Sequence, residues 1–251
     1  MSEEFIFGKN SVEALLEKSE RSINKIFILS NMQKDAKISK IIKLANSQNV
    51  PVTNISKDKF TKIIGSDVNH QGVMAGVSPI NYADLDEVLL NIKNKGTLPL
   101  IVLLDNVEDP QNLGAIIRSS EVLGVDAVVI PERRSASITG IVSKVSSGAV
   151  EFLPIVKVTN ISKTIEQLKK EGFWVIGAEY LPKSEFVYNV KYDMPCAVVM
   201  GSEGKGVSRL VRESCDILVK IPQSGKITSL NVANALSIVL YEIVRQRTQA
   251  K

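Results

Sequence analysis

From residue 98 onward the chain alternates short, uninterrupted apolar segments with longer amphipathic ones, and this alternation restricts the fold more than any other feature. The apolar segments are expected strands at residues 100–104, 127–130, 155–158, 174–178, 197–200 and 217–221. The amphipathic segments are expected helices at residues 113–123, 138–147, 161–171 and 232–246. Strands that are apolar along their whole length are typical of a parallel sheet with helices on both faces. The sequence therefore predicts an α/β domain with a mostly parallel sheet.

A smaller α/β unit precedes this domain. Its expected helices are residues 11–18, 37–48 and 57–65, and its expected strands are residues 23–29, 50–55 and 72–78. The next segment contains a short acidic helical stretch bracketed by Pro79, Gly96 and Pro99, which is typical of a linker. For a chain of 251 residues two domains are the better expectation. We expect an N-terminal domain at residues 1–78, a linker at 79–97 and a C-terminal domain at 98–251.

Composition argues against several classes of protein. No segment approaches the run of about 18 to 20 apolar residues that a membrane helix needs, and the start of the chain is acidic where a signal peptide would be basic. We therefore expect a cytoplasmic protein without a membrane partner. Cys196 and Cys215 lie beside expected core strands without metal-ligand spacing, and His70 is the single histidine. Buried thiols are thus favoured over a disulfide, and no metal site is expected.

The charge of the chain is only mildly basic, with a formal net charge of +4 and a pI of about 8.9. Within the N-terminal domain Lys34, Lys37, Lys40 and Lys43 recur at helical spacing. Such a stripe can face RNA phosphates, but it is more often a solvated helix face. Charge alone leaves both interpretations open.

Two of the expected strands run directly into polar, conformationally permissive loops. The first loop is residues 201–206, GSEGKG, and the second extends from Pro222 to Asn231. Three glycines expose backbone amides, and Glu203 adds a carboxylate among them. The spacing matches neither the dinucleotide fingerprint nor the P-loop. An ordinary strand-to-helix turn is the alternative, but ligands of α/β sheets bind outside the carboxyl ends of strands, where both loops lie.

A third polar cluster follows the first strand of the C-terminal domain, at residues 105–114. Asn112 is either a helix cap or a site residue. Arg118, further along the same expected helix, is either a surface cation or a side chain that projects near the loop at the start of the helix.

Three motifs in these segments resemble, in the correct order, those of the SpoU (TrmH) class of RNA 2'-O-ribose methyltransferases. They are NLGAIIR at residues 112–118, VMGSEGKG at 199–206, and the segment from Ile221-Pro222 to SLNVA at 229–233. Near the N-terminus, GKNSVEAL at residues 8–15 and HQGV at 70–73 are similar to the substrate-binding domain of the RlmB type, which methylates a guanosine ribose in 23S ribosomal RNA. The N-terminal similarity is less specific, because related tRNA enzymes share such domains.

The resemblance implies a fold, a cofactor and a partner. It implies a small L30e-like substrate-binding domain followed by a C-terminal α/β-knot (SPOUT) domain, and S-adenosylmethionine as cofactor. The matching cofactor-binding positions are Gly201, Ile221 and Leu230, and the matching polar active-site positions are Asn112, Arg118, Glu203, Ser229 and Asn231. The class also implies a homodimer with the knot at the interface. The apolar stripe Leu236, Val239, Leu240 and Ile243 is compatible with that interface and equally with intramolecular core.

Methyl transfer to a ribose oxygen requires positioning and removal of a proton. We expect Arg118 to bind an RNA phosphate and stabilise the developing alkoxide, because a guanidinium is a poor base. Glu203 is expected to position the nucleoside or to accept a proton through water, and Ser229 and Asn231 to fix the hydroxyl. Ribosomal RNA is favoured over tRNA as substrate. A noncatalytic RNA-binding or ribosome-assembly factor of the same fold is the alternative.

Overall fold

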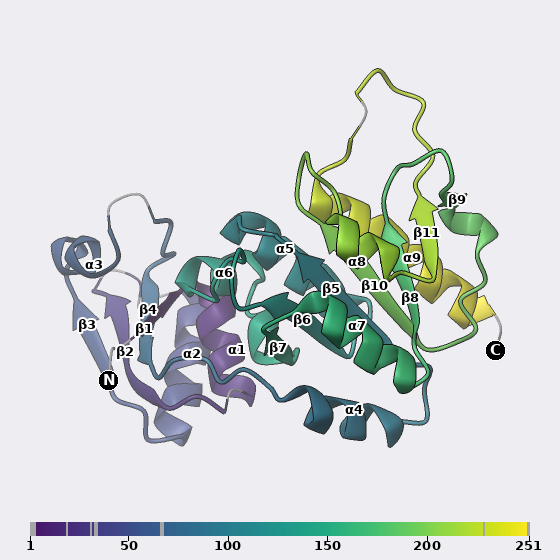
Figure 1. Ribbon diagram of the computed structural model, residues 1–251. Helices are drawn as coiled ribbons and strands as arrows, with labels where there is room; N and C mark the ends of the chain where they lie inside the picture. Colours follow the sequence, from purple (N-terminus) through teal and green to yellow (C-terminus); the bar gives the residue numbers. More distant parts are fainter. Residues whose placement is uncertain are drawn as a thin grey trace. The chain divides into compact units, whose positions relative to one another are not determined.

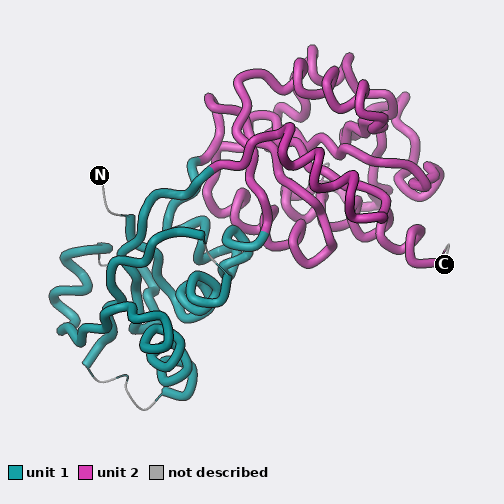
Figure 2. Tube along the Cα trace, turned by 90° about the horizontal axis from the view of Figure 1, so that it is seen from below, with its two compact units in different colours: residues 1–81, 137–152 teal, residues 82–136, 153–251 magenta. Residues whose placement is uncertain are grey.

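The computed structural model describes residues 4–18, 20–30, 32, 35–65, 68–227 and 229–249. Its internal contacts group into two compact units, coloured separately in Figure 2. Unit 1 comprises Met1–Asn81 and Ser137–Phe152, and unit 2 comprises Tyr82–Ala136 and Leu153–Lys251.

Unit 1 is a four-stranded sheet with helices (Figure 1). Its strands lie in the order β1-β4-β2-β3, in which β4 pairs antiparallel with β1 and β2, and β2 pairs parallel with β3. The elements are β1 (Glu4–Phe7), α1 (Lys9–Lys18), β2 (Ile23–Leu29), α2 (Ala36–Ser47), β3 (Val52–Ile55), α3 (Lys57–Ile64) and β4 (Val73–Val77). The expected helices and strands are all present, and β1 is an additional strand that the sequence pattern did not indicate.

A segment distant in sequence completes unit 1. It contains α6 (Gly140–Val145) and the short 3-10 helix η1 (Ala149–Glu151). The Ser11 hydroxyl on α1 donates a hydrogen bond to the carbonyl oxygen of Ser143 at 2.9 Å. A Cβ at Gly140 would lie 2.3 Å from the carbonyl oxygen of Phe5, so only glycine permits this approach of α6 to β1.

The two units therefore differ in extent from the expected domains at two places. Residues 82–97, expected as linker, fall in unit 2, where α4 (Leu85–Lys93) buries Leu85, Val88, Leu89 and Ile92 in the core. Residues 137–152, expected within the C-terminal domain, share their contacts with unit 1. The two units describe how residues pack. The division into an RNA-binding domain, a linker and a methyltransferase domain stays a prediction.

Unit 2 is built on a seven-stranded sheet in which every neighbouring pair is parallel, as predicted. The order is β7-β6-β5-β10-β8-β11-β9. The strands are β5 (Leu100–Asp105), β6 (Ala127–Pro131), β7 (Ile155–Val158), β8 (Trp174–Ala178), β9 (Glu185–Phe186), β10 (Cys196–Gly201) and β11 (Ile217–Lys220). The remaining helices are α5 (Pro110–Val122), α7 (Ile161–Lys170), η2 (Val187–Asn189), α8 (Arg209–Glu213) and α9 (Val232–Gln249).

Helices cover both faces of this sheet, which explains why its strands are apolar throughout. One core cluster joins α4, α7 and α8 to alternate residues of the strands, such as Ile101 and Leu103. On α5 and α9, which pack against each other, a second set of side chains is buried: Leu113, Ile116, Ile117, Leu236, Val239, Leu240 and Ile243. The last four have no exposed surface within a single chain, so the stripe on the final helix is intramolecular core.

Strand β10 lies between β5 and β8, and this order positions the site. From β5 the chain proceeds to β6 and β7 on one side, whereas β8 and β11 lie on the other side of β10. Such a reversal of strand order opens a crevice at the carboxyl edge, where ligands of open α/β sheets bind.

Both cysteines are free thiols, and burial raises their pKa values, to about 12 for Cys215.

None of the described helices is long and apolar enough to cross a membrane. Within the same residues, no cluster of three His, Cys, Asp or Glu side chains forms a possible metal site.

Candidate active site

Three loops meet at the carboxyl edge of the sheet in unit 2. They follow β5, β10 and β11, which are parallel strands and therefore end on the same side. Each of the polar positions singled out from the sequence lies in one of these loops or on the helix that follows it.

Asn231 links all three loops. Its side-chain amide donates to the side-chain oxygen of Asn112 at 2.7 Å and to a carboxylate oxygen of Glu203 at 2.7 Å. Its side-chain oxygen accepts from the backbone amides of Ala233 at 3.0 Å and Asn234 at 3.3 Å, so Asn231 also caps α9. One residue thereby fixes the start of a helix and joins two other site residues.

Asn112 is not the cap of its helix. The carboxylate of Asp109 accepts from the amides of Gln111 and Asn112 at 3.1 and 3.3 Å, and Pro110 occupies the first helical position. Because Asp109 caps α5, the buried side chain of Asn112 is left to pair with Asn231.

Asp105, at the end of β5, holds two of the loops together, and the sequence analysis did not identify it as a site residue. Its buried carboxylate accepts from the backbone amide of Ser208 at 2.7 Å and from the Asn106 side-chain amide at 2.7 Å. An acidic residue directly after an apolar strand was the available signal.

The three predicted cofactor positions line a single cavity of about 200 Å³. Gly201, Ile221 and Leu230 approach it from β10, from the segment after β11 and from the loop before α9, and Glu203 and Ser229 line it too. Its walls combine apolar side chains, such as Met200 and Val239, with backbone at strand ends and with carboxylates. That combination fits S-adenosylmethionine, which carries a flat purine, polar ribose hydroxyls and a positive sulfonium.

The glycine at position 201 is required by the loop itself. A Cβ there would lie 2.1 Å from the carbonyl carbon of Gly206 and 2.3 Å from the amide nitrogen of Val207. The loop closes as a tight bridge in which Ser202 and Gly206 exchange backbone hydrogen bonds of 3.0 and 3.2 Å. The close neighbour that requires a glycine at position 201 is therefore protein backbone.

Glu179 stands at the wall of the same cavity, just after β8. Its carboxylate pairs with the Arg212 guanidinium at 3.2 Å and would lie 2.8 Å from a Cβ at Gly206. The loop after β10 is therefore packed directly against this ion pair.

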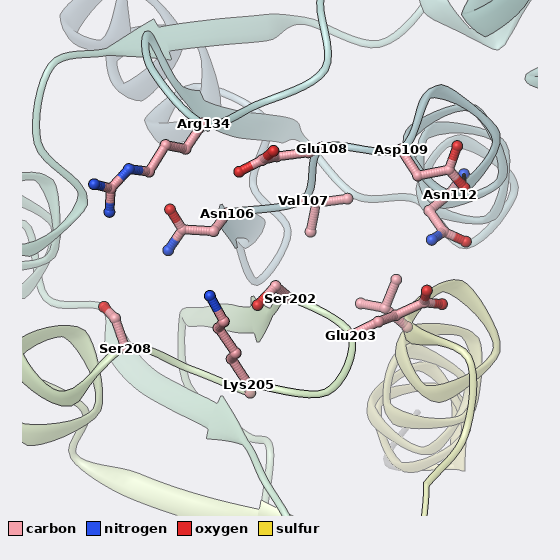
Figure 3. A pocket seen from close by; sticks show the side chains of 12 residues that line it. Asn106, Val107, Glu108, Asp109, Asn112, Arg134, Ser202, Glu203, Lys205 and Ser208 are labelled. Atoms are coloured by element: carbon pink, nitrogen blue, oxygen red, sulfur yellow. Dashed lines mark hydrogen bonds between the residues drawn. The ribbon is translucent and has the colours of Figure 1, made fainter.

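Figure 3 shows a second cavity, of about 630 Å³, and the residues that it shares with the first cavity show that the two adjoin. The two share Ser202, Glu203, Gly206 and Val232. Asn112 lines the larger cavity, together with Asn106, Glu108, Arg134 and Lys205. Asn106, Glu108 and Lys205 lie in the polar segments described from the sequence, whereas Arg134 lies outside them. Arg134 follows β6 at the same edge of the sheet, so its position relative to that strand was the missed signal.

Arg118 is separate from the other predicted site residues. It is exposed on α5, lines neither of the two cavities, and has no hydrogen bond or ion pair with any residue that the structure describes. Asn112, Glu203, Ser229 and Asn231, by contrast, all lie at the cavities or directly on their hydrogen-bonded rim.

Two of the four lysines of the possible stripe on the second helix of unit 1 pair with carboxylates. Lys37 and Lys40 contact Glu13 at 2.7 and 2.6 Å, and Lys40 also contacts Glu17 at 2.9 Å. Lys34 lies outside the described residues. These ion pairs favour the solvated helix face over a phosphate-binding stripe.

Two protein-family models and several named relatives match this chain. The family model "SpoU rRNA Methylase family" matches residues 99–241, and the model "RNA 2'-O ribose methyltransferase substrate binding" matches residues 5–83. A Staphylococcus haemolyticus protein named for the TrmH family of tRNA/rRNA methyltransferases is 42% identical over 99% of this chain and 98% of its own length. The similarly named YacO of Bacillus subtilis is 38% identical over 97% and 96%.

A solved structure shares the whole fold. The SpoU methyltransferase AviRb from Streptomyces viridochromogenes, crystallised with the cofactor AdoMet, superimposes with a TM-score of 0.81 at 23% identity, covering 98% of this chain and 91% of that one. With the two matching family models and relatives aligned over nearly their full lengths, the chain belongs to the SpoU/TrmH family of S-adenosylmethionine-dependent RNA methyltransferases.

Proposed function

We propose that this protein methylates the 2'-oxygen of a ribose in RNA, most specifically a guanosine of 23S ribosomal RNA. The observation that carries the proposal is the position of Glu203, which lines both the cofactor cavity and the larger cavity beside it. A ligand in the larger cavity thus lies next to the methyl donor. The guanosine and 23S assignments come from the resemblance of residues 8–15 and 70–73 to RlmB-type enzymes.

Bound S-adenosylmethionine supplies the electrophilic methyl group. Gly201, Ile221 and Leu230 hold it, because these positions line the smaller cavity. Glu203 faces the ribose and accepts its proton directly or through water, while the amide of Asn231 fixes the Glu203 carboxylate at 2.7 Å. Asn112 steadies Asn231 from the opposite side, and Ser229 adds a hydroxyl at the cofactor cavity.

The proposal includes a homodimer. Val122 on α5 and Tyr241 on α9 are 72% and 60% exposed, and Ile238 on α9 is 39% exposed. These three apolar side chains belong to two helices that pack against each other, and we propose that they form the surface that binds a second copy. Arg118 precedes Val122 by one helical turn and shares its exposed side of α5. A dimer formed there would place Arg118 against the partner, where its proposed contact with an RNA phosphate would depend on assembly.

The alternatives are a tRNA 2'-O-methyltransferase and a noncatalytic RNA-binding factor. The linked side chains of Asn112, Asn231 and Glu203 favour an enzyme, because binding alone does not need a carboxylate fixed between two cavities. A trefoil knot in unit 2 and a cytoplasmic location, both implied by family and composition, complete the proposal.

Two measurements test it. Calorimetry is expected to show binding of S-adenosylmethionine to the purified protein. Ribose-methyl-sensitive sequencing of RNA from a strain lacking the gene is expected to show loss of one site in 23S ribosomal RNA. Loss of a tRNA site instead would contradict the proposed ribosomal RNA substrate. Failure to bind the cofactor would contradict the proposed methyltransferase activity.

A further inference from the structure

The larger cavity has two chemically different ends. In Figure 3, Asp109, Asn112 and Glu203 gather on one side, while Arg134 and Lys205 lie toward the other. The carboxylates of the first end already have partners, because Asp109 caps α5 and Glu203 accepts from Asn231. A third lining carboxylate, that of Glu108, lies between the two ends in Figure 3. The cations of the second end have no such partners: no ion pair or hydrogen bond joins Arg134 or Lys205 to another side chain in the part of the chain that the structure describes.

The loop that carries Arg134 is held in an unusual conformation. Arg134 has a φ of 58°, a left-handed value that costs about 1 kcal/mol for a residue with a side chain. The backbone amide of Ala136 donates to the carbonyl oxygen of Val107 at 3.0 Å, which ties this loop to the loop after β5. Asn106 in that second loop also has a positive φ, of 62°, and lines the same cavity. Asparagine adopts such an angle readily, so the backbone strain beside this cavity lies at Arg134, and strained residues are common at ligand sites.

We propose that Arg134 and Lys205 bind a backbone phosphate of the RNA next to the nucleotide whose ribose lies at Glu203. The inference rests on the proposed function. A nucleotide is itself bipolar, with neutral hydroxyls on its ribose and negative charge on its phosphates. The cavity presents hydrogen-bonding groups at one end and two cations without side-chain partners at the other, and the Glu108 carboxylate lies between the ends. The Arg134 guanidinium and the Lys205 ammonium come from different loops and can both donate charge-assisted hydrogen bonds to the oxygens of one phosphate. Arg134 and Lys205 are therefore phosphate-binding residues within a single chain, independent of Arg118.

The test compares R134A and K205A with R133A. Arg133 is an exposed neighbour of Arg134 that lines neither cavity, so its removal changes the net charge equally. The probes are unmodified transcripts of 23S ribosomal RNA and of tRNA. We expect R134A and K205A each to weaken RNA binding about tenfold, the effect of one charge-assisted contact, with unchanged binding of S-adenosylmethionine in calorimetry. The slope of log affinity against log salt should fall by about 0.7 to 0.9 per lost phosphate contact.

R133A is expected to match the wild type in both measurements. If R134A and K205A behave like R133A on both RNAs, the phosphate site is wrong. If the wild type binds the cofactor but methylates neither RNA, the proposed function fails, and the salt series still decides whether Arg134 and Lys205 contact phosphate. R134K, which keeps the charge but loses the planar donor group, should retain the salt slope while losing part of the affinity.

Discussion

The side-chain amide of Asn231 donates to the side-chain oxygen of Asn112, 119 positions earlier in the chain, at 2.7 Å. The same amide reaches Glu203, and the oxygen of Asn231 caps α9. Asn231 thus both caps α9 and holds two candidate active-site side chains. Two substitutions of Asn231 should separate its effect on stability from its effect on methyl transfer.

N231A removes both the cap and the two amide contacts, whereas N231D keeps a capping oxygen but loses the donors and brings a second carboxylate to Glu203. We expect N231A to lower the free energy of unfolding by about 1 kcal/mol, the usual cost of losing a cap, and N231D to stay close to wild type. Methyl transfer should fall strongly in both. Urea unfolding and a transfer assay with labelled cofactor measure the two effects; an active N231D would contradict the role of the amide.

The second prediction concerns Gly201. In G201A the new methyl group would overlap the backbone of Gly206 and Val207, and a fixed backbone cannot yield as a side chain can. We expect a loss of about 1 to 3 kcal/mol in stability and greatly weakened binding of S-adenosylmethionine. G225A is the matched control, because the nearest atom to its added Cβ is 4.0 Å away. Equal cofactor affinity in the two variants would show that the Ser202 to Gly206 bridge does not shape the cavity.

The third prediction is a pH dependence in unit 1. Partial burial, followed by the charges of Lys144 and Lys57, holds the pKa of His70 below its ordinary value of about 6.5. Its Nδ1 atom accepts from the Gly72 amide at 3.0 Å, and its ring stacks on Phe60 at 4.6 Å. The folded state therefore binds this proton more weakly than the unfolded state, so the stability contributed by neutral His70 is present above about pH 6.5 and is lost as pH falls through the lower, folded-state pKa.

His70 is the single histidine, so its imidazole C2 proton gives one signal in a proton NMR titration. We expect the midpoint of that titration below 6.5. In H70Q the acid limb of the stability profile should become flatter, although loss of the stacked ring will also lower stability at neutral pH. A midpoint at or above 6.5 would contradict the environment described for the ring.

The strands of unit 2 and the loops at its ligand-binding edge could be predicted, because short sequence patterns determine them. A strand buried on both faces is apolar throughout, and a loop after such a strand lies at the ligand-binding edge, so the positions of Asn112, Glu203 and Asn231 at one edge followed from their place after strands. The order of the strands did not follow. Nothing in the residues of β10 shows that it lies between β5 and β8, and the contact of Asn231 with Asn112 depends on that order.

Close packing between distant segments was equally hidden. Gly140 lies within the helix expected at residues 138–147 and Gly148 directly follows it, yet added Cβ atoms there would lie 2.3 Å from the Phe5 oxygen and 2.5 Å from the Ala14 Cβ. A glycine shows that something approaches, but the sequence does not show what approaches. For this reason the sequence pattern predicts residues 137–152 as part of the C-terminal domain, whereas their contacts lie with unit 1.

The last prediction tests the homodimer. V122K and Y241E each put a charge on the exposed apolar surface shared by α5 and α9, and neither side chain belongs to the buried core. In sedimentation the wild type should have about twice the chain mass of 27.5 kDa, and both variants should shift toward monomer while remaining folded. L90K is the control: Leu90 is 62% exposed on α4, whose buried side chains pack in the other core cluster, so its charge should leave the dimer intact.

If Arg118 acts only in the assembled dimer, V122K and R118A should lose methyl transfer to a similar extent while both still bind S-adenosylmethionine. A wild type that sediments as a monomer would exclude the dimer and leave Arg118 without a route to either cavity.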